Sequence, residues 1–482
     1  MMTLDTDICI IGAGSGGLSV AAGASQMGAS TVLIEKGKMG GDCLNYGCVP
    51  SKSLLAAGHV AEGIREGHRY GVTADGPRVD GAAVHKHVHG VIGAIAPNDS
   101  VERFEGLGVK VIQAAARFVD DRHVEADGVR VRARRFVVAT GSSPAIPPVP
   151  GLDAVPYLTN ENIFDLTSVP DHLVVVGGGP IGIEMAQAHR HLGARVTVLQ
   201  RSAIMPKDDP ELVDIVRTRL IEDGIEVLEG TKIVRIDEKP GGGVAVTVAG
   251  REATGDGNGA AERVIEGSHL LVAVGRQASV DGLDLDKAGI EFSPKGIRVD
   301  SGLRTTNRRV YAIGDVAGGY QFTHVAGYHA GVVIKNALFR IPSKEDTRTV
   351  PWVTYTTPEL AQVGMVESQA KERHGDIRIL RWPFHENDRA QAERDTDGLV
   401  KVVATPKGHI LGAGIVGKSA GELLHVWVLA MSQKLKVGAV ATMIAPYPTL
   451  GEVNKRAAGS FYTPKLFSDR TRKIVRFLSR FG

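Results

Sequence analysis

Short apolar runs alternate with glycine-rich turns near the start of the chain. Residues 7–11 (DICII) are mostly apolar and are followed by the turn GAGSGG and by LSVAAGASQMG, which has a helical composition. A second apolar run at residues 31–34 (TVLI) ends at Glu35. Continuous apolar runs bounded by turns are typical of buried strands in a parallel sheet. The pattern predicts a strand, helix and strand unit of an α/β fold.

The first turn has the composition of a dinucleotide site. Gly12, Gly14 and Gly17 permit a tight turn, the close approach of a pyrophosphate and helix packing, and the amides of the following helix attract the phosphate charge. Glu35 stands at the strand end where an acid can hold ribose hydroxyls. A glycine-rich loop without a ligand would not need the strand, helix and acid at these spacings.

The same arrangement recurs in the middle of the chain. The apolar run 172–176 (HLVVV) leads into a turn with Gly177, Gly179 and Gly182, a helix, and a second run at 195–199 (RVTVL). Two dinucleotide units in one chain imply two dinucleotides, as in an enzyme that passes electrons from a nicotinamide to a flavin.

The second unit differs from the first at the end of its second strand. Gln200 and Arg201 stand there, and no acid does. An acid would repel a 2′-phosphate and an arginine would attract one, so the sequence favours NADPH over NADH. The alternative is that Arg201 is a solvated surface residue.

Two further strand ends carry candidate flavin-binding residues. Residues 139–144 (ATGSSP) turn away from the first unit, and residues 309–315 (RVYAIGD) are a buried strand that ends in an acid able to accept a hydrogen bond from the ribityl chain. With Gly275, the candidate cofactor-binding residues outside the two glycine turns are Thr140, Gly141, Gly275, Gly314 and Asp315.

Composition limits the class of protein. A chain of 482 residues suggests about three domains, and an apolar fraction of 43% can fill their cores. The chain has 56 Lys and Arg residues and 54 Asp and Glu residues. This near balance does not indicate nucleic acid or an anionic membrane as a partner, so we expect small molecules as partners. The N-terminus lacks a basic export signal, and no run approaches roughly 18 apolar residues, so we expect a cytoplasmic protein.

Two of the three cysteines lie close together in residues 40–52 (GGDCLNYGCVPSK). A metal site, a structural disulfide and a redox-active dithiol are the three interpretations. Two cysteines make half of a structural zinc site, and the third, Cys9, lies in a predicted buried strand. A reducing cytoplasm disfavours a permanent disulfide.

The local sequence gives the two cysteines different roles. Positions five apart do not face each other on a straight helix, so residues 45–47 must be irregular for the sulfurs of Cys43 and Cys48 to meet. Pro50 suits the first turn of a helix, which would place Cys48 at its positive end and lower the thiol pKa. Cys48 is thus the better resident thiolate and Cys43 the better attacker of an outside substrate.

Together these motifs resemble the flavin-dependent pyridine nucleotide-disulfide oxidoreductases, which include dihydrolipoamide dehydrogenase, glutathione reductase and mercuric reductase. The resemblance covers nearly the whole chain and implies bound FAD, a homodimer, and an α/β fold with two Rossmann-like domains and an α+β dimerisation domain. It implies a split FAD domain (1–150 and 270–345), an NAD(P)H domain (151–269) and a dimerisation domain (346–482). Residues 254–261 (TGDGNGAA) are predicted to be a mobile loop.

The resemblance also implies roles for four residues. Cys48 would match the flavin-contacting sulfur and Cys43 the interchange sulfur. Lys52 would match the lysine near the flavin N5, and Glu184 its carboxylate partner. The alternative is that Lys52 is solvated and Glu184 is an ordinary helix residue.

Near the C-terminus the chain departs from the disulfide reductases of this family. They carry a histidine that protonates the leaving thiolate across the dimer, whereas the matching segment 445–452 (APYPTLGE) has Tyr447 there, with Glu452 behind it. A phenol with a pKa of about 10 is a poor proton shuttle at neutral pH, which argues against efficient turnover of lipoamide or glutathione. Mercuric reductase is similar at this tyrosine but ends in a cysteine pair, and no cysteine follows Cys48 here. We expect Tyr447 to orient the acceptor, with Glu452 behind it; alternatively, Tyr447 only packs at an interface.

The resulting hypothesis is an FAD-dependent enzyme that passes electrons from NADPH through a Cys43–Cys48 disulfide to a small-molecule acceptor. A soft metal ion, a reactive electrophile such as a hypohalous species, and a small disulfide are the candidate acceptors. Two alternatives remain: a dihydrolipoamide dehydrogenase-like enzyme and a flavin-binding redox sensor with little turnover.

Two weaker patterns remain outside this hypothesis. His85, His87 and His89 invite a metal interpretation, but no carboxylate or cysteine is adjacent in sequence, and we expect a solvated helix without a metal. The basic segment 465–482 has apolar residues at helical spacing, which suits docking on the dimer or, alternatively, an anionic membrane surface. These apolar residues are Ile474, Phe477, Leu478 and Phe481.

Overall fold

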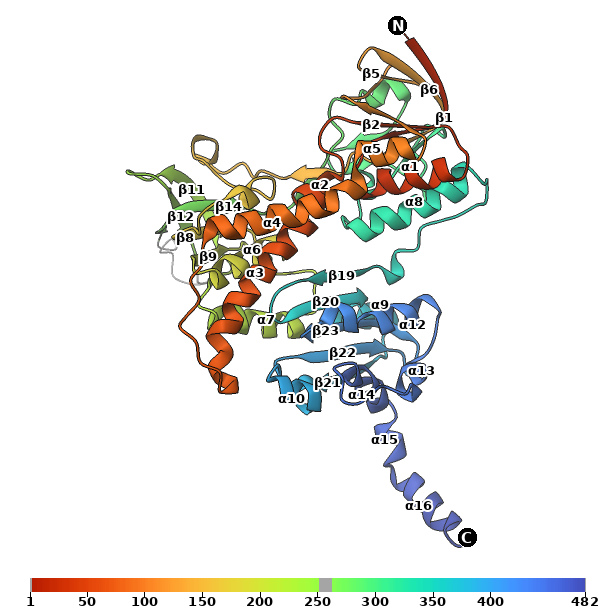
Figure 1. Ribbon diagram of the computed structural model, residues 1–482. Helices are drawn as coiled ribbons and strands as arrows, with labels where there is room; N and C mark the ends of the chain where they lie inside the picture. Colours follow the sequence, from red (N-terminus) through yellow and green to blue (C-terminus); the bar gives the residue numbers. More distant parts are fainter. Residues whose placement is uncertain (1, 251–261, 482) are drawn as a thin grey trace, which may run out of the picture. The chain divides into compact units, whose positions relative to one another are not determined.

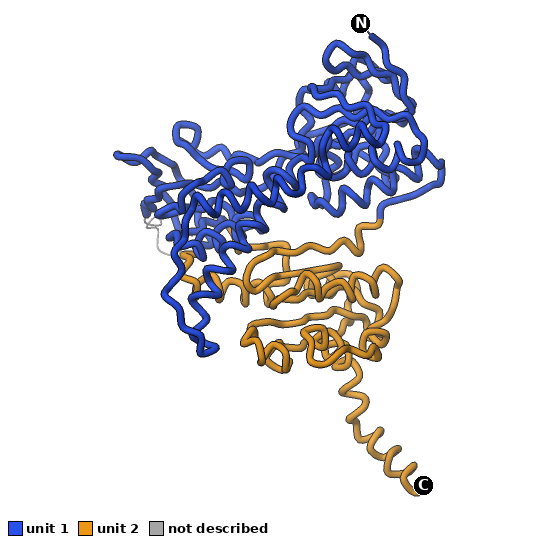
Figure 2. The backbone as a smooth tube through the Cα atoms, in the orientation of Figure 1, with its two compact units in different colours: residues 1–201, 228–345 blue, residues 202–227, 346–482 orange. Residues whose placement is uncertain are grey.

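The computed structural model describes residues 2–250 and 262–481 (Figure 1). The predicted loop at 254–261 lies outside the described residues. The chain forms two compact units, shown in blue and orange in Figure 2. Unit 1 comprises Met1–Arg201 and Leu228–Glu345, and unit 2 comprises Ser202–Val227 and Asp346–Gly482.

A largely parallel sheet lies at the centre of the first part of unit 1. Its strand order is β3-β2-β1-β6-β5-β4, with β18 also paired to β6. Helices α1 (Ser15–Gln26) and α8 (Thr323–Ala337) pack against each other beside it. The strands are β1 (Met2–Ile11), β2 (Thr31–Glu35), β3 (Val109–Gln113), β4 (Arg117–Phe118), β5 (His123–Ala126), β6 (Val129–Val138) and β18 (Val310–Ala312).

Strand β1 begins five residues before the apolar run that predicted it. Its polar first half pairs with β6, where Asp5 and Asp7 meet arginines of the neighbouring strand. The Asp5 carboxylate accepts hydrogen bonds of 2.6 and 2.8 Å from Arg132, and Asp7 accepts one of 2.8 Å from Arg134. Cross-strand pairs of opposite charge stabilise this extension, and an apolar pattern alone does not reveal them.

The second dinucleotide-type sheet of unit 1 repeats the first on a smaller scale. Strands β8 (His172–Val176), β9 (Arg195–Leu199) and β14 (His269–Val272) are parallel, and β10 (Glu226–Leu228) lies at the edge. Helix α6 (Pro180–His191) joins β8 to β9 as α1 joins β1 to β2. An antiparallel sheet of β11 (Lys232–Glu238), β12 (Val244–Ala249) and β13 (Glu262–Gly267) follows.

Four α-helices lie between β2 and β3 in the chain. The helices are α2 (Gly41–Asn45), α3 (Cys48–Glu66), α4 (Gly81–Ile95) and α5 (Val101–Gly106). Strands β7 (Ser142–Pro144) and β15 (Arg276–Ala278) form an antiparallel pair. No helix of the described residues is long and apolar enough to cross a membrane.

Unit 2 is an antiparallel sheet with helices packed on it. The strand order is β19-β20-β23-β22-β21. Trp427 is fully buried in its core and donates a 2.7 Å hydrogen bond to the Asn454 side chain. The strands are β19 (Pro351–Thr354), β20 (Glu359–Gly364), β21 (Arg378–Pro383), β22 (Leu399–Ala404) and β23 (Ile410–Gly417).

The helices of unit 2 include α7 (Pro210–Glu222), α9 (Glu367–His374), α10 (Asp388–Glu393), α11 (Ala420–Leu423), α12 (His425–Ser432), α13 (Val437–Thr442) and α14 (Glu452–Ser460). Two parallel-sheet regions in unit 1 and an α+β unit 2 confirm the predicted fold class.

Candidate active site

Cys43 and Cys48 lie on either side of a break between two helices. Cys43 is in α2, Cys48 is the first residue of α3, and Gly47 between them has φ −127° and ψ −111°, which is not helical. This confirms both the irregular segment and the helix that starts at Cys48. Both cysteines are free thiols, with Cys43 half-buried and Cys48 exposed, and their side chains are hydrogen-bonded to each other.

The surroundings of the two thiols push their pKa values apart. The hydrogen bond from Cys43 is the main cause that lowers the pKa of Cys48, to about 6, and Thr323 and the positive charge of Lys52 act in the same direction. The same sulfur pairing and partial burial raise the pKa of Cys43. Thr323 Oγ1 lies 3.5 Å from Cys48 Sγ. The reduced pair therefore holds one thiolate, at Cys48, and one neutral thiol, at Cys43, at neutral pH.

A charged pair joins the cysteine helix to the second dinucleotide unit. Lys52 Nζ on α3 donates a 2.7 Å hydrogen bond to Glu184 Oε2 on α6. The Glu184 side chain is 6% exposed and that of Lys52 is 36% exposed. Close packing brings the helices together, because a Cβ on Gly58 of α3 would lie 3.3 Å from the Ala188 carbonyl of α6. A buried carboxylate needs such a partner, so the pair fixes where the ammonium of Lys52 lies.

A second polar network holds the residue next to Cys43. The Asp42 carboxylate lies 3.0 Å from Arg276 Nη2 and accepts a 3.0 Å hydrogen bond from the Asn160 side chain. Arg276, whose side chain is 11% exposed, also donates to the Ser142 hydroxyl at 2.7 Å and lies 3.9 Å from Asp315. Burial raises the pKa of Asp315, and Ser142 and Arg276 oppose that rise. The network connects the cysteine segment to a candidate flavin-binding acid.

Sequence reasoning missed Asp42, Asn160, Ser142 and Arg276, which lie far apart along the chain. Arg276 directly follows Gly275, a candidate cofactor-binding residue, and this position is the available sequence signal for it. It also missed His329, whose Nδ1 accepts a 3.2 Å hydrogen bond from the Gly314 amide while Nε2 lies 3.2 Å from Glu345. This buried histidine fixes the backbone at the Gly314 turn.

The residues of the first glycine turn fit a flavin dinucleotide. A Cβ on Gly12, whose φ is +106°, would lie 2.4 Å from the Ala139 carbonyl, and one on Gly17 would lie 1.9 Å from the Gly12 carbonyl. Gly14 caps α1 with no side-chain hydrogen bond and no acid in the first turn, which leaves the helix N-terminus suited to a pyrophosphate. Glu35 accepts a 2.6 Å hydrogen bond from the Ala13 amide, so its carboxylate lies beside the turn.

The remaining candidates lie on turns around this sheet. Gly141, with φ +69°, follows Thr140, whose hydroxyl donates to the Ser279 carbonyl at 2.7 Å. Gly314, with φ +66°, starts the turn that carries Asp315.

The second glycine turn has the same close backbone contacts as the first. A Cβ on Gly177 (φ +119°) would lie 2.2 Å from the Ala273 carbonyl, and one on Gly182 would lie 2.0 Å from the Gly177 carbonyl. Gly179 caps α6, again without a side-chain hydrogen bond. Nearby, Gly275 has φ +141°. The repeated contacts explain why glycine recurs at the same spacing in both turns.

Gln200 has the same position relative to the second glycine turn as Glu35 has relative to the first. Its Oε1 accepts a 2.8 Å hydrogen bond from the Gly178 amide, as Glu35 does from the Ala13 amide. Gln200 therefore makes the same hydrogen bond to its turn as Glu35 does, but it carries no negative charge. Arg201 beside it is exposed.

Tyr447 and Glu452 belong to unit 2. Tyr447 is 71% exposed, and its hydroxyl donates a 2.9 Å hydrogen bond to Asp388. The hydrogen bond to Asp388 is the main cause that raises the pKa of the phenol, and the negative charges of Asp388 and, to a smaller extent, of Glu452, the first residue of α14, act in the same direction. The phenol is thereby an even weaker acid than an unperturbed tyrosine.

The structure corrects the expectation about the histidine cluster. His85 and His89 lie on α4, as predicted for a helix, with ring centroids 4.0 Å apart. A carboxylate does lie beside them, because Asp165 Oδ1 is 3.4 Å from His89 Nε2. Sequence distance concealed this contact, since Asp165 is the last residue of a separate short 3-10 helix, Ile163–Asp165.

Comparisons with known proteins agree with this geometry. Residues 6–330 match the family described as pyridine nucleotide-disulphide oxidoreductase, and residues 350–458 match the dimerisation domain of the same family. The chain is 36% identical to a mercuric reductase of Bacillus cereus over 461 residues, covering 95% of this chain and 72% of that protein. It is 32% identical to a dihydrolipoyl dehydrogenase of Bacillus subtilis, covering 92% of this chain and 96% of that protein.

A solved structure is similar over nearly the whole chain. The Cu(II) complex of the HOCl-induced flavoprotein disulfide reductase RclA from Escherichia coli superposes with a TM-score of 0.82 at 26% identity, covering 93% of this chain and 98% of that one. The chain belongs to the pyridine nucleotide-disulfide oxidoreductases. It is therefore an FAD-dependent enzyme that uses a pyridine nucleotide and a redox-active disulfide, and its dimerisation domain supports a homodimer.

The hydrogen bond between the sulfurs predicts how the Cys48 thiolate responds to substitution. Cys43→Ala removes the donor and should raise the pKa of Cys48 by about 1 to 2, the equivalent of one hydrogen bond to a charged group. Cys43→Ser keeps a donor and should raise it less. The pH dependence of Cys48 alkylation by iodoacetamide measures both values. Equal pKa values in the two variants would contradict the assigned cause.

Proposed function

We propose that this enzyme uses NADPH to reduce a thiophilic acceptor that needs no proton from the protein, with a soft metal ion as the foremost candidate. The observation that carries the proposal is the contrast between the pKa of Cys48 and the pKa of Tyr447. The dithiol offers a thiolate at neutral pH, while the residue in the proton-donor position is a phenol whose pKa is raised. A disulfide acceptor needs that proton and a metal ion does not.

Bound FAD supplies the step that connects a two-electron hydride donor to a disulfide. The chain's own residues prepare the rest. Glu184 holds Lys52 so that a positive charge lies near Cys48 and favours its thiolate. Cys48 is assigned as the thiolate that faces the flavin, and Cys43 as the thiol that engages the acceptor. Arg276 and Asn160 hold Asp42, and through it the position of Cys43.

The electron count suits a metal acceptor. One NADPH gives two electrons and a proton, and the dithiol passes the electrons on as it closes to the disulfide. They reduce one Hg(II) to Hg(0), or two Cu(II) ions to Cu(I), which thiolates bind well. The names of the similar proteins, a mercuric reductase and a flavoprotein reductase solved with Cu(II), support this class. A reactive electrophile such as a hypohalous species is also compatible, because thiolate attack on it needs no protein acid.

Domain assignment follows the same proposal. Residues 1–150 and 270–345 would form the FAD domain, 151–269 the NADPH domain and 346–482 the dimerisation domain. The pairing of β18 with β6 in one sheet supports joining the two separated FAD segments.

A dihydrolipoamide dehydrogenase-like activity is the main alternative, supported by the similarity to the Bacillus subtilis protein. Tyr447 disfavours it. A redox sensor with little turnover is the other alternative, and acceptor turnover distinguishes it from an enzyme.

An acceptor panel tests the proposal. With NADPH, Hg(II) or Cu(II) should be turned over rapidly and lipoamide slowly. Tyr447→His should increase lipoamide turnover by about 10²-fold, the lower range for a positioned general acid, and leave metal reduction unchanged. Tyr447→Phe, which keeps the ring and removes the hydroxyl, is the matched control and should match the wild type on metals. Rapid lipoamide turnover by the wild type, unimproved by Tyr447→His, would establish the dehydrogenase alternative instead.

Coenzyme preference has its own test at the end of β9. Gln200→Glu restores an acid where Glu35 stands in the first turn and should decrease kcat/KM for NADPH by at least about tenfold, because the carboxylate repels the 2′-phosphate. Arg201→Gln should decrease it by a similar factor while kcat/KM for NADH stays constant. Equal use of NADPH and NADH by the wild type would contradict the assigned preference.

A further inference from the structure

The last part of the chain lies beyond the matched domains. The dimerisation-domain match ends at residue 458. Residues 463–482, called the tail below, contain α15 (Thr463–Leu466) and α16 (Asp469–Leu478). Ser468 caps α16 by accepting a hydrogen bond from the Thr471 amide, so the helix has a defined start. Within unit 2, Figures 1 and 2 show the tail extending away from the sheet and its packed helices.

One face of α16 and the turn after it is apolar and exposed. Ile474, Phe477, Leu478 and Phe481 recur at the i, i+3, i+4 and i+7 spacing of a helix face, and each is between 49% and 75% exposed. The rings of Phe477 and Phe481 are 5.2 Å apart, so the face continues past the end of the helix. Large apolar side chains gathered on one exposed face mark a contact surface.

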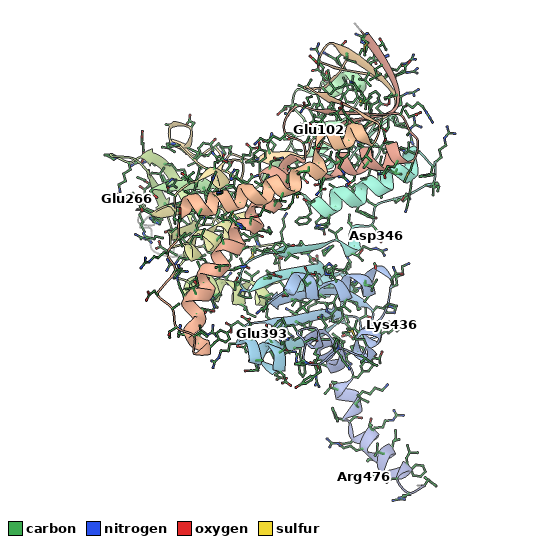
Figure 3. All side chains as sticks on the ribbon, viewed as in Figure 1. Glu102, Glu266, Asp346, Glu393, Lys436 and Arg476 are labelled. Carbon is green, nitrogen blue, oxygen red and sulfur yellow. The ribbon has the colours of Figure 1, made fainter. Side chains whose placement is uncertain are left out.

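The side of the helix opposite this apolar face is rich in basic residues. By helical spacing Arg472, Lys473 and Arg476 lie on this side, and Arg480 follows just after the helix; Figure 3 labels Arg476 on the tail. The tail has six basic residues and one acid, a net charge of +5 in a chain whose total is +2, so the remaining residues carry a net charge of −3. The net positive charge of the chain therefore comes from its tail.

The combination of an apolar face and a basic side indicates the kind of surface that the tail binds. We propose that the tail binds in the plane of an anionic lipid surface, with its apolar face in the acyl boundary and its basic residues at the headgroups. At 10 residues, α16 is about 15 Å long, too short to span a bilayer. Contact between the tails of two copies would instead bring two +5 segments together. A lipid surface satisfies both faces at once.

Flotation of the full-length, FAD-loaded protein with vesicles tests this proposal. Binding to phosphatidylcholine vesicles that contain phosphatidylglycerol should be at least about tenfold tighter than to phosphatidylcholine alone, and should weaken with added salt. Phe477→Ser with Phe481→Ser should abolish binding, and Arg472→Gln with Arg476→Gln should weaken it by about tenfold or more at low salt. Ser479→Ala alters neither face and should bind as the wild type does.

Two further measurements make the outcome decisive. NADPH-driven FAD reduction should be the same in all variants, because the tail lies outside both matched domains; this verifies that they are folded. Size-exclusion chromatography should show the same oligomeric state throughout. Absence of wild-type binding to the anionic vesicles would overturn the proposal. If Phe477→Ser with Phe481→Ser alters the oligomeric state and leaves vesicle binding intact, the tail contacts a second copy of the chain instead.

Discussion

The contact between Cys43 and Cys48 is the interaction on which the rest of the site depends. The chain must leave the helical path after α2 and begin α3 anew at Cys48, because five residues of continuous helix would point the sulfurs apart. The break also places Cys48 at a helix N-terminus, where the dipole favours a thiolate. One local departure from helix thus brings the sulfurs together and divides their roles.

Two polar links hold this segment against both dinucleotide units. Lys52 and Glu184 connect α3 to α6 behind the second glycine turn, and Arg276 connects Asp42 to the acid that follows the first sheet. Each link includes a largely buried charged group, so its partner cannot be removed without leaving that charge unpaired. The cysteine segment is therefore positioned by elements of both dinucleotide units, which suits a pair of sulfurs that receives electrons through them.

Local steric requirements made much of this predictable from sequence. Gly17 and Gly182 recur because a side chain at either would collide with a carbonyl in its own turn, and Pro50 indicated the helix that starts at Cys48. Side chains that are brought together only by the tertiary fold have no recognisable spacing in the sequence. Arg276 reaches Asp42 and Asp165 reaches His89 across long stretches of chain, and His329 supports Gly314 from the following helix α8. The arginines of β6 likewise extend β1 beyond its apolar run.

The most direct test of the account follows electrons into the sulfurs. The oxidised, FAD-loaded enzyme is treated anaerobically with one equivalent of NADPH, alkylated under denaturing conditions, and mapped by mass spectrometry. The account predicts new alkylation at Cys43 and Cys48, with Cys9 labelled equally before and after reduction. Consumption of NADPH with no new label on Cys43 or Cys48 would contradict it, because the electrons would then leave the enzyme by another route.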